Sequence, residues 1–456
     1  MRVALLVILA LLVLAAPASA QLLGHGLGGG LGSGGRLDLP SLPIVRDTEG
    51  LLARTTDDVS GRLDDLVTRR LDTAGDLLDR HPDVLEKSPQ GDLIVRHEVL
   101  AYAPSDAALS AAAAAGFTVV SQDTLDGIGA RVAVFDAPHG MSTHEALKRL
   151  HTLDPEGVYD YNDIYLGSAS FKVLGKVSSS GPAGDDTAVH GEGMHGEGGG
   201  RVGLIDGGVD AGHPALHGAD IEQKAFSGAL TPSEHGTETA SLLAGRTDGF
   251  SGAAPGAQLV VADIYGNAPT GGSTGALLRA LDWMAQKHVA VINISLVGPP
   301  NEPLRAAVAT LVGRGYLIVA AVGNDGPAAK PLYPASFPGV IGVTAVDRKN
   351  RVLMEAGRGP QVAFAAPGAD IAAAVPKGAY AEVRGTSFAA PIVAGLLARQ
   401  LSRPDPAEAK AAVAALAASA SPLGAAAPNP VYGAGLVGGD IRPDLHTATT
   451  ALKKKS

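Results

Sequence analysis

The sequence contains no cysteine, and this absence removes several kinds of chemistry at once. Disulfide bonds, thiolate metal sites and a cysteine nucleophile are excluded, so any covalent catalysis must use another side chain. Basic residues are also in the minority, because 36 Lys and Arg stand against 46 Asp and Glu and the formal net charge is -10. Without a surplus of positive charge, the chain is not expected to bind nucleic acid.

Long apolar runs are equally scarce, and we find one only at the N-terminus, in residues 3–16. Arg2 precedes this run and Ala18-Ser19-Ala20 follows it, a pattern typical of a signal peptide that is cut after Ala20. A membrane anchor is the alternative, but the run is shorter than the roughly 20 residues that a spanning helix needs. We therefore expect residues 1–20 to direct export, and the mature protein to be secreted or periplasmic and to carry no membrane span.

The 456 residues are more than one ordinary domain needs, and their composition divides them into segments. Residues 21–90 begin with a Gly-rich tether and continue with apolar residues three and four apart, a pattern that favours short helices. Residues 168–198 are rich in Ser, Gly and acidic residues and predict an exposed linker. Two His and two Glu in this linker could bind a metal ion, but their spacing is not that of a helical zinc motif, so no metal site is predicted. Residues 446–456 read as a solvated C-terminal tail.

Residues 91–167 have a periodicity of their own, in which strand-like runs alternate with helical ones. One helix is expected at 105–115, and a second begins at Ser142, where Ser142 and Glu145 form a capping-box pattern. The order βαββαβ predicts a small ferredoxin-like α+β domain. The four expected strands are 93–103, 117–121, 131–135 and 158–166.

Residues 199–445 alternate short apolar runs with helical ones, which predicts an α/β fold with a parallel sheet and helices on both faces. In such sheets, functional groups gather beyond the carboxyl ends of the strands, so candidate residues should be sought there. The expected strands are 201–205, 259–264, 289–295, 316–322 and 340–346.

Three polar residues stand at positions of this kind. Asp206 follows an apolar strand, where a buried carboxylate would need a partner, and a turn cap is the alternative. His235 precedes a helical run of small residues, although a lone His is more often an ordinary polar residue. Ser387 opens a helix, whose free N–H groups favour developing negative charge, and an N-cap is the alternative.

Together these residues have the chemistry of an activated nucleophile. A Ser hydroxyl is a poor nucleophile unless a base takes its proton, and His235 can be that base. Asp206 can fix the tautomer of the imidazole and stabilise the imidazolium. Asn324 follows the strand at 316–322 in a turn, where its amide could join the Ser387 N–H in an oxyanion hole, with an Asx turn as the alternative.

The surroundings of these four residues resemble the motifs of the subtilase family of serine peptidases. The matching segments are Ile205-Asp206-Gly207-Gly208-Val209-Asp210, His235-Gly236-Thr237, Ala321-Val322-Gly323-Asn324 and Gly385-Thr386-Ser387-Phe388-Ala389-Ala390-Pro391. The order Asp, His, Ser along the chain is also that of the family. The resemblance implies a subtilisin-like fold and a secreted serine endopeptidase that works through an acyl-enzyme, with Asp206, His235 and Ser387 as its triad and Asn324 in its oxyanion hole.

The same resemblance implies roles for other parts of the chain. Residues 91–167 look like a subtilase propeptide, an inhibitor and folding aid that the enzyme itself cuts off within 168–198. Polypeptides are the expected substrates, and Val297 stands where subtilisins usually have Gly. The branched side chain of Val297 predicts a preference for small or medium apolar residues before the cut bond. The expected substrate-binding residues are Ser295, Leu296, Val297, Gly298, Ala321 and Gly323.

Departures from the family pattern leave two points open. Gly207 replaces the Thr or Ser that commonly follows the catalytic Asp, so one hydrogen bond around Asp206 is expected to be absent. Subtilases often bind a structural Ca²⁺, but the loop at 245–250 looks shorter than the family's calcium loop, so no metal ligands are assigned and Ca²⁺ is kept only as a candidate ion.

Two alternatives to an active peptidase exist. One is a catalytically dead subtilase kept for binding, which the four intact functional residues argue against. The other is a relative that uses Glu and Asp with Ser at acid pH, which His235 within its motif argues against.

Overall fold

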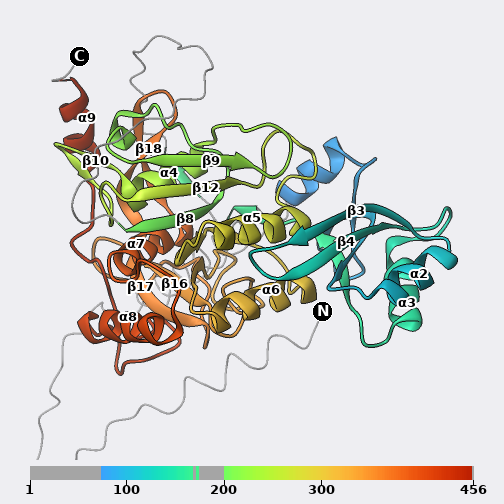
Figure 1. The fold of residues 1–456 in the computed structure, drawn as a ribbon. Helices are drawn as coiled ribbons and strands as arrows, with labels where there is room; N and C mark the ends of the chain where they lie inside the picture. The colour runs from blue at the N-terminus through green and yellow to red at the C-terminus, as the bar shows by residue number, and fades with distance from the viewer. Residues whose placement is uncertain (1–72, 168–170, 174–199, 454–456) are drawn as a thin grey trace, which may run out of the picture. The chain divides into compact units, whose positions relative to one another are not determined.

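The computed structural model describes residues 73–167, 171–173 and 200–453, all of which fall in one unit, Thr56–Ser456 (Figure 1). The expected signal peptide, the Gly-rich tether and most of the expected linker lie outside the described residues. No helix within these described ranges is long and apolar enough to cross a membrane.

The first described part of the chain has the predicted order βαββαβ, preceded by residues 73–80, which are helical, and by one additional strand. Its pairings are antiparallel, and the strand order β3-β4-β2-β5 is that of a ferredoxin-like sheet. The additional strand β1 pairs with the start of β2. The elements are β1 (Leu85–Lys87), β2 (Leu93–Tyr102), α2 (Asp106–Ala114), β3 (Thr118–Leu125), β4 (Ala130–Asp136), α3 (Thr143–Leu153) and β5 (Val158–Asp163).

The two helices of this part begin where the sequence predicts, because the capping side chains are in place. Ser105 Oγ accepts a hydrogen bond from the backbone N–H of Ala108. Ser142 and Glu145 make the two reciprocal bonds of a capping box. Caps of this kind are worth about 1 kcal/mol each, so they fix the starts of two short helices that have little apolar surface to bury.

The predicted parallel sheet is confirmed. It has seven strands in the order β17-β16-β15-β13-β8-β12-β9. The five central strands coincide with predicted segments, and the edge strands β9 and β17 were not predicted. The strand bounds are β8 (Arg201–Asp206), β9 (Ile221–Ala225), β12 (Gln258–Asp263), β13 (Val291–Ile294), β15 (Leu317–Ala321), β16 (Ile341–Val346) and β17 (Val362–Pro367).

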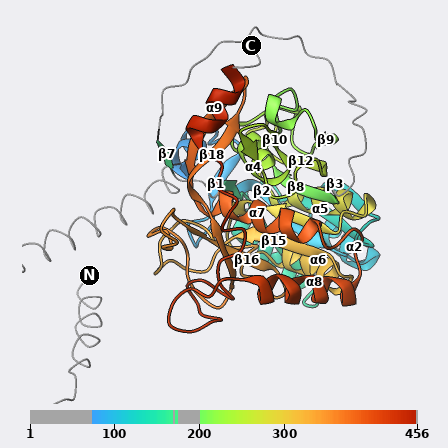
Figure 2. The same cartoon turned by 90° about the vertical axis from the view of Figure 1, so that its left-hand side faces the viewer.

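Helices cover both faces of this sheet (Figures 1 and 2). Along β13, Val291 packs into the apolar core that contains α4 and α7, while Ile292 packs into the core that contains α5 and α6. This alternation explains why the strands are apolar on both faces. The helices are α4 (Glu234–Ala244), α5 (Thr274–Gln286), α6 (Glu302–Gly313), α7 (Thr386–Ala398), α8 (Pro406–Ser419) and α9 (Leu445–Lys453).

Short strands complete the architecture. β18 and β19 form a hairpin that leads into α7, and β7 extends it to three strands. β14 pairs with β6, and β10 pairs with β11. Their bounds are β6 (Leu166–Gly167), β7 (Phe171–Val173), β10 (Arg246–Thr247), β11 (Phe250–Ser251), β14 (Leu296–Val297), β18 (Ala369–Val375) and β19 (Ala379–Arg384).

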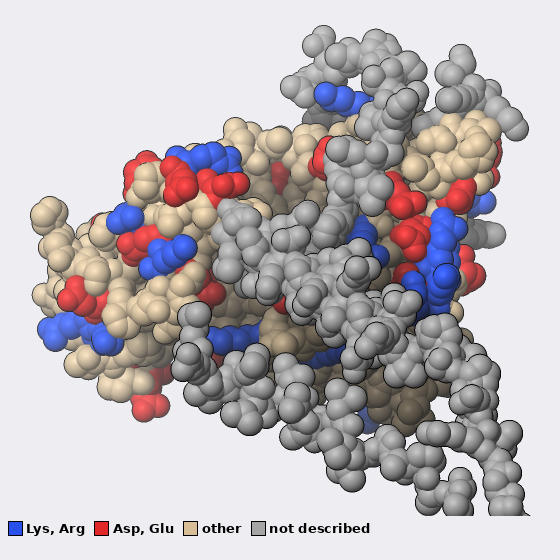
Figure 3. All heavy atoms as spheres, turned by 180° about the vertical axis from the view of Figure 1, so that it is seen from behind, with Lys and Arg blue, Asp and Glu red and all other residues tan. Residues whose placement is uncertain are grey.

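The ferredoxin-like part contacts the N-terminal ends of α5 and α6. Asn162 Oδ1 accepts from the N–H of Gly275 at 3.0 Å, and Asp160 Oδ2 accepts from the N–H of Glu302 at 3.0 Å. The first N–H groups of a helix have no partner within the helix, so these two side chains satisfy donors that would otherwise face water. On the face shown in Figure 3, acidic and basic side chains are interspersed.

Candidate active site

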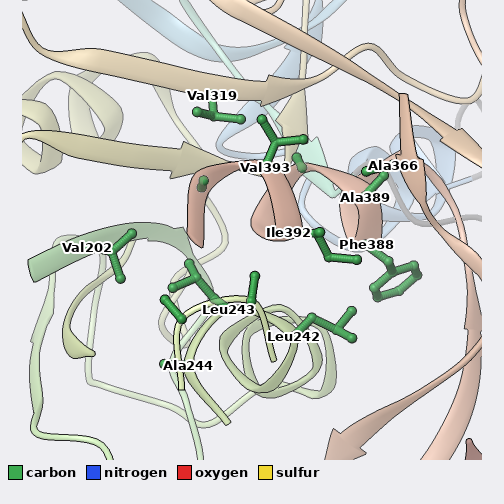
Figure 4. Packing of buried hydrophobic residues seen from close by; sticks show 14 of the residues in the cluster. Val202, Leu242, Leu243, Ala244, Val319, Ala366, Phe388, Ala389, Ile392 and Val393 are labelled. Carbon is green, nitrogen blue, oxygen red and sulfur yellow. The ribbon is translucent and has the colours of Figure 1, made fainter. Parts of the chain in front are cut away.

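The four candidate residues are supplied by neighbouring elements at the carboxyl edge of the parallel sheet. Asp206 is the last residue of β8, and Asn324 follows the end of β15. His235 is the second residue of α4, and Ser387 is the second residue of α7. These two helices pack against each other through Leu242 and Leu243 of α4 and the apolar face of α7 (Figure 4). Packing between α4 and α7 therefore fixes where the imidazole and the hydroxyl can lie.

Asp206 and His235 are joined by a hydrogen bond between His235 Nδ1 and Asp206 Oδ1 at 2.8 Å. Asp206 is 1% exposed, and its carboxylate also accepts from the N–H of Gly207 at 2.7 Å and from Thr239 Oγ1 at 3.3 Å. These bonds satisfy a carboxylate that would otherwise be costly to bury. The hydroxyl of Thr239 on α4 thus supplies the side-chain hydrogen bond that Gly207 cannot make.

A close contact explains why residue 207 is a glycine. A Cβ at this position would lie 2.3 Å from Ser233 Oγ. Ser233 is the N-cap of α4, and its Oγ accepts from the N–H of Gly236 at 2.9 Å. The missing side chain at residue 207 therefore leaves room for the cap of the helix that carries His235.

The pKa of the His235 imidazole is raised above its ordinary value. Burial, the largest influence, lowers the pKa, but the charge of Asp206, the hydrogen bond that the imidazole donates to that carboxylate and the charge of Glu238 together outweigh it. A base with a raised pKa accepts a proton more readily, which suits a residue that must deprotonate an alcohol.

Ser387 is fully buried, and its hydroxyl makes no hydrogen bond within the described part of the chain. The N-cap of α7 is Gly385, at φ 149°, so Ser387 is not the cap of this helix. His235 Nε2 and Asn324 Nδ2 are likewise buried and without a partner among the described residues. A buried polar atom left unpaired costs about 1–3 kcal/mol, so three such atoms in one region indicate a site that receives a ligand.

The orientation of the Asn324 amide is fixed from its other side. Its Oδ1 accepts from the N–H of Thr386 at 3.1 Å, which leaves Nδ2 as a free donor. The ring of His235 packs beside Phe388, the neighbour of Ser387, with centroids 5.7 Å apart. Hydrogen bonds between catalytic groups often tighten only when substrate is bound, so the unpaired Ser387 Oγ and His235 Nε2 are compatible with a proton relay.

The expected substrate-binding residues lie around this site. Leu296 and Val297 form β14, which is paired with β6, and Ser295 Oγ donates to the carbonyl of Ser387 at 2.9 Å. Gly298 exchanges backbone bonds with Tyr333. The two remaining residues follow from β15: Ala321 is its last residue, and the N–H of Gly323 donates to Thr386 Oγ1 at 3.2 Å.

The partner of β14 is a segment of the chain itself. Leu166 is opposite Val297 and Gly167 is opposite Leu296 in an antiparallel ladder. A Cβ at Gly167 would lie 4.0 Å from the ring of His235. The strand predicted at 158–166 is therefore interrupted, because its last residues leave the ferredoxin-like sheet and pair beside the candidate site.

Tyr165 anchors this segment. Its N–H donates to Gly272 O at 2.8 Å, its hydroxyl donates to Pro299 O at 2.8 Å, and its side chain is fully buried. Farther along the chain, β7 pairs with β19, the strand that precedes Ser387. The chain thus forms backbone ladders with β14, whose neighbour Ser295 bonds to Ser387, and with β19, which precedes Ser387 in the sequence.

The loop at 245–250, which looks shorter than the family's calcium loop, is a tight hairpin formed by β10 and β11. Over the described ranges of the chain, no group of three or more His, Cys, Asp or Glu residues could hold a metal ion. The His and Glu residues of the 168–198 linker lie outside the described residues.

A profile of the subtilase family, Peptidase_S8, matches residues 198–435. The chain belongs to the subtilase family. Subtilisin E of Bacillus subtilis (strain 168) is 32% identical over 225 residues, which are 47% of this chain and 58% of that protein. Subtilisin Savinase of Lederbergia lenta is 34% identical over 220 residues, which are 46% of this chain and 79% of that protein. The matched region thus spans somewhat more than half the length of Subtilisin E.

Among solved structures, fervidolysin from Fervidobacterium pennivorans is similar to this subtilase with a TM-score of 0.59 and 20% identity. The match covers 80% of this chain and 62% of that one. At this identity the likeness concerns the fold alone, and it agrees with the parallel sheet and its covering helices.

Sequence reasoning missed several side chains that support the site in this subtilase. Thr239 stands four residues after His235, a helical spacing that brings it under the same carboxylate. Ser233 and its role as a cap could have been read from its place two residues before His235. Tyr265, whose hydroxyl donates to the carbonyl of Tyr165, directly follows the strand predicted at 259–264, so its position was a signal that was not used. Gly272, whose carbonyl accepts from the Tyr165 N–H, stands in no such motif.

Proposed function

We propose that this subtilase is a secreted serine endopeptidase that cuts polypeptides and is made as a self-processing precursor. The observation that carries the proposal is the hydrogen bond between the buried Asp206 carboxylate and His235 Nδ1. The other imidazole nitrogen, His235 Nε2, and the nearby Ser387 hydroxyl are both buried and have no partner among the described residues. Export rests on residues 1–20, whose pattern is that of a signal peptide.

In the proposed reaction, His235 Nε2 takes the proton of Ser387 Oγ as that oxygen attacks the carbonyl carbon of the substrate. Asp206 keeps the imidazole in the required tautomer and stabilises the imidazolium. The Asn324 amide and the Ser387 N–H donate to the oxyanion. The amine leaves with the proton from His235, and water then hydrolyses the acyl-Ser387 ester by the same steps in reverse order.

The proposed self-inhibition and self-processing rest on the segment around Gly167. Its ladder with β14 has the form in which an extended peptide adds to a strand edge, and its sequence neighbours include the proposed cut site. Gly167 is the last described residue before the expected 168–198 linker, and it pairs with Leu296, the neighbour of Ser295, whose hydroxyl donates to the carbonyl of Ser387. We therefore place the proposed first cut within that linker.

The proposed specificity follows from Val297. This side chain is 1% exposed, and one of its methyl carbons would lie 3.5 Å from a Cβ at Gly323. It occupies space between two expected substrate-binding segments, which supports a preference for small or medium apolar residues before the cut bond. A peptide-library profile dominated by Phe or Arg at that position would contradict this preference.

The test compares the wild-type chain with Ser387→Ala. We expect the wild type to hydrolyse casein, to be blocked by a serine-directed fluorophosphonate, and to yield a mature N-terminus within residues 168–198. We expect Ser387→Ala to accumulate as the uncut chain without activity. Casein hydrolysis that survives this substitution would overturn the proposed mechanism.

A further inference from the structure

An ion pair with a buried carboxylate, outside the proposed triad, lies next to the turn that carries Asn324. The Glu355 side chain is 3% exposed, while that of Arg384 is 32% exposed. Arg384 donates from Nε to Glu355 Oε1 at 2.6 Å and from Nη2 to Oε2 at 3.0 Å. This two-pronged geometry is the strongest and most directional pairing of these groups. Because a carboxylate out of contact with water needs a partner, the position of Glu355 depends on Arg384.

The backbone around Glu355 holds the Asn324 turn from one side. The N–H of Gly326 donates to Glu355 O at 2.8 Å, and the N–H of Gly357 donates to Gly323 O at 3.0 Å. Both ends of the turn from Gly323 to Gly326 are therefore hydrogen-bonded to residues 355–357, and Asn324 lies between these two bonds.

Arg384 holds the nucleophile from the other side. It is the last residue of β19 and stands three positions before Ser387. Between them, the N–H of Thr386 donates to Asn324 Oδ1 at 3.1 Å. The ion pair ties Arg384 to residues 355–357, which hold the Asn324 turn, and the Thr386 bond ties the same strand end to Asn324 itself. These two connections limit how far Asn324 can move relative to Ser387.

We propose that Glu355 and Arg384 are positioning residues, which keep the Asn324 amide where it can receive the oxyanion formed at Ser387. Neither residue belongs to the sequence motifs that carry the likeness to the family, and neither is given a chemical step. The inference rests on the proposed function, because it assigns a purpose to the Asn324 donor. It requires that the pair act on the rate of the chemical step and act through Asn324.

The experiment is a double-mutant cycle between Glu355→Gln and Asn324→Ala. Each variant is made as the full chain, left to mature and titrated with fluorophosphonate, so that rates refer to active sites. We expect Glu355→Gln to lower kcat about tenfold with KM unchanged, since a 1 Å misplacement of a catalytic group can cost about 10²-fold. In the Asn324→Ala background, we expect the same substitution to change kcat less than twofold.

One further variant tests the ion pair again, and another serves as a control. Arg384→Lys keeps the positive charge but cannot donate two parallel hydrogen bonds to Glu355. It should therefore lower kcat by a similar factor, again without effect in the Asn324→Ala background. Glu408→Gln breaks the exposed pair with Arg403, whose side chains are 67% and 50% exposed for Arg and Glu, and should leave kcat unchanged. If a variant does not mature, the rate of self-cleavage in its precursor, an intramolecular reaction without a KM, replaces kcat with the same expectations.

Several outcomes would overturn the inference. Equal losses in both backgrounds would mean that the pair supports the fold without acting through Asn324. A change confined to KM, or wild-type kcat in Glu355→Gln, would equally refute it. Activity retained by Ser387→Ala would refute the proposed function itself, which keeps the two failures distinct.

Discussion

Tyr165 offers the most direct test of the proposed self-inhibition. Its side chain is fully buried beside the candidate site, and its hydroxyl donates to Pro299 O at 2.8 Å. Replacing a buried aromatic residue by Ala costs about 3–5 kcal/mol. We expect Tyr165→Ala to weaken binding of the cut ferredoxin-like domain by about 10²- to 4 × 10³-fold, because every 1.4 kcal/mol is tenfold in affinity. Tyr165→Phe loses only the hydroxyl bond, so about 1 kcal/mol, or roughly fivefold, is expected.

The measurement is the recovery of peptidase activity when the processed but unseparated enzyme is diluted in steps, which gives the dissociation constant of the bound domain. Tyr159→Phe is the matched control. Tyr159 is 3% exposed in the core of the same domain, and its hydroxyl donates to Asp154 instead of to the parallel-sheet part of the chain. Unchanged affinity in Tyr165→Ala, or an equal loss in Tyr159→Phe, would refute the reasoning that Tyr165 anchors the inhibitory segment.

Three further predictions concern charge and space around the site. Glu238→Gln removes one of the charges that raise the pKa of His235, so the acid limb of the pH–rate profile should move to lower pH; an unmoved limb would show that this charge does not reach the imidazole. Asp163 lies in the contact with α6, and burial raises the pKa of its carboxyl group. Binding of the ferredoxin-like domain should therefore be strongest at acid pH and weaken as pH rises through that pKa. Asp163→Asn should flatten this pH dependence of the dissociation constant. Gly207→Ser should lower the free energy of unfolding by about 1 kcal/mol or more, because its Cβ would meet the Ser233 cap. Adding Ser233→Gly should partly restore the stability. Denaturant titration measures both variants, and an unchanged stability of Gly207→Ser would refute this prediction.

The sequence predicted the central strands and the capped helices well because local signals decide them. Strands such as β13 are buried on both faces, and their apolar residues leave no alternative to a central position in the sheet. Edge strands such as β9 are half-buried and mixed in composition, so their pattern resembles that of a loop. The capping box at Ser142 is a purely local contact and appeared as predicted.

The candidate site was predictable only in part. Residues such as Asp206 and Ser387 stand in motifs at strand or helix ends, so chemistry and position together drew attention to them. Thr239 lies one helical turn after His235, a local signal that could have been read. Glu355 and Arg384 act through contacts between segments far apart in sequence, and nothing local distinguishes them from ordinary surface residues. The break of the predicted strand after Asp163 has the same origin, because its last residues pair with β14 instead of continuing along β2.

The contacts of Asn162 and Asp160 with the starts of α5 and α6 have a consequence for how the protein reaches its native state. The parallel sheet joins strands from distant parts of the chain, with β8 between β12 and β13, and such topologies fold slowly because long loops must close first. The ferredoxin-like part is built from neighbouring strands and short turns, so it can form early and offer a ready surface that nucleates both helices. Enzyme denatured after losing residues 73–167 should therefore regain activity far more slowly than the intact chain, and adding that domain back should restore the rate.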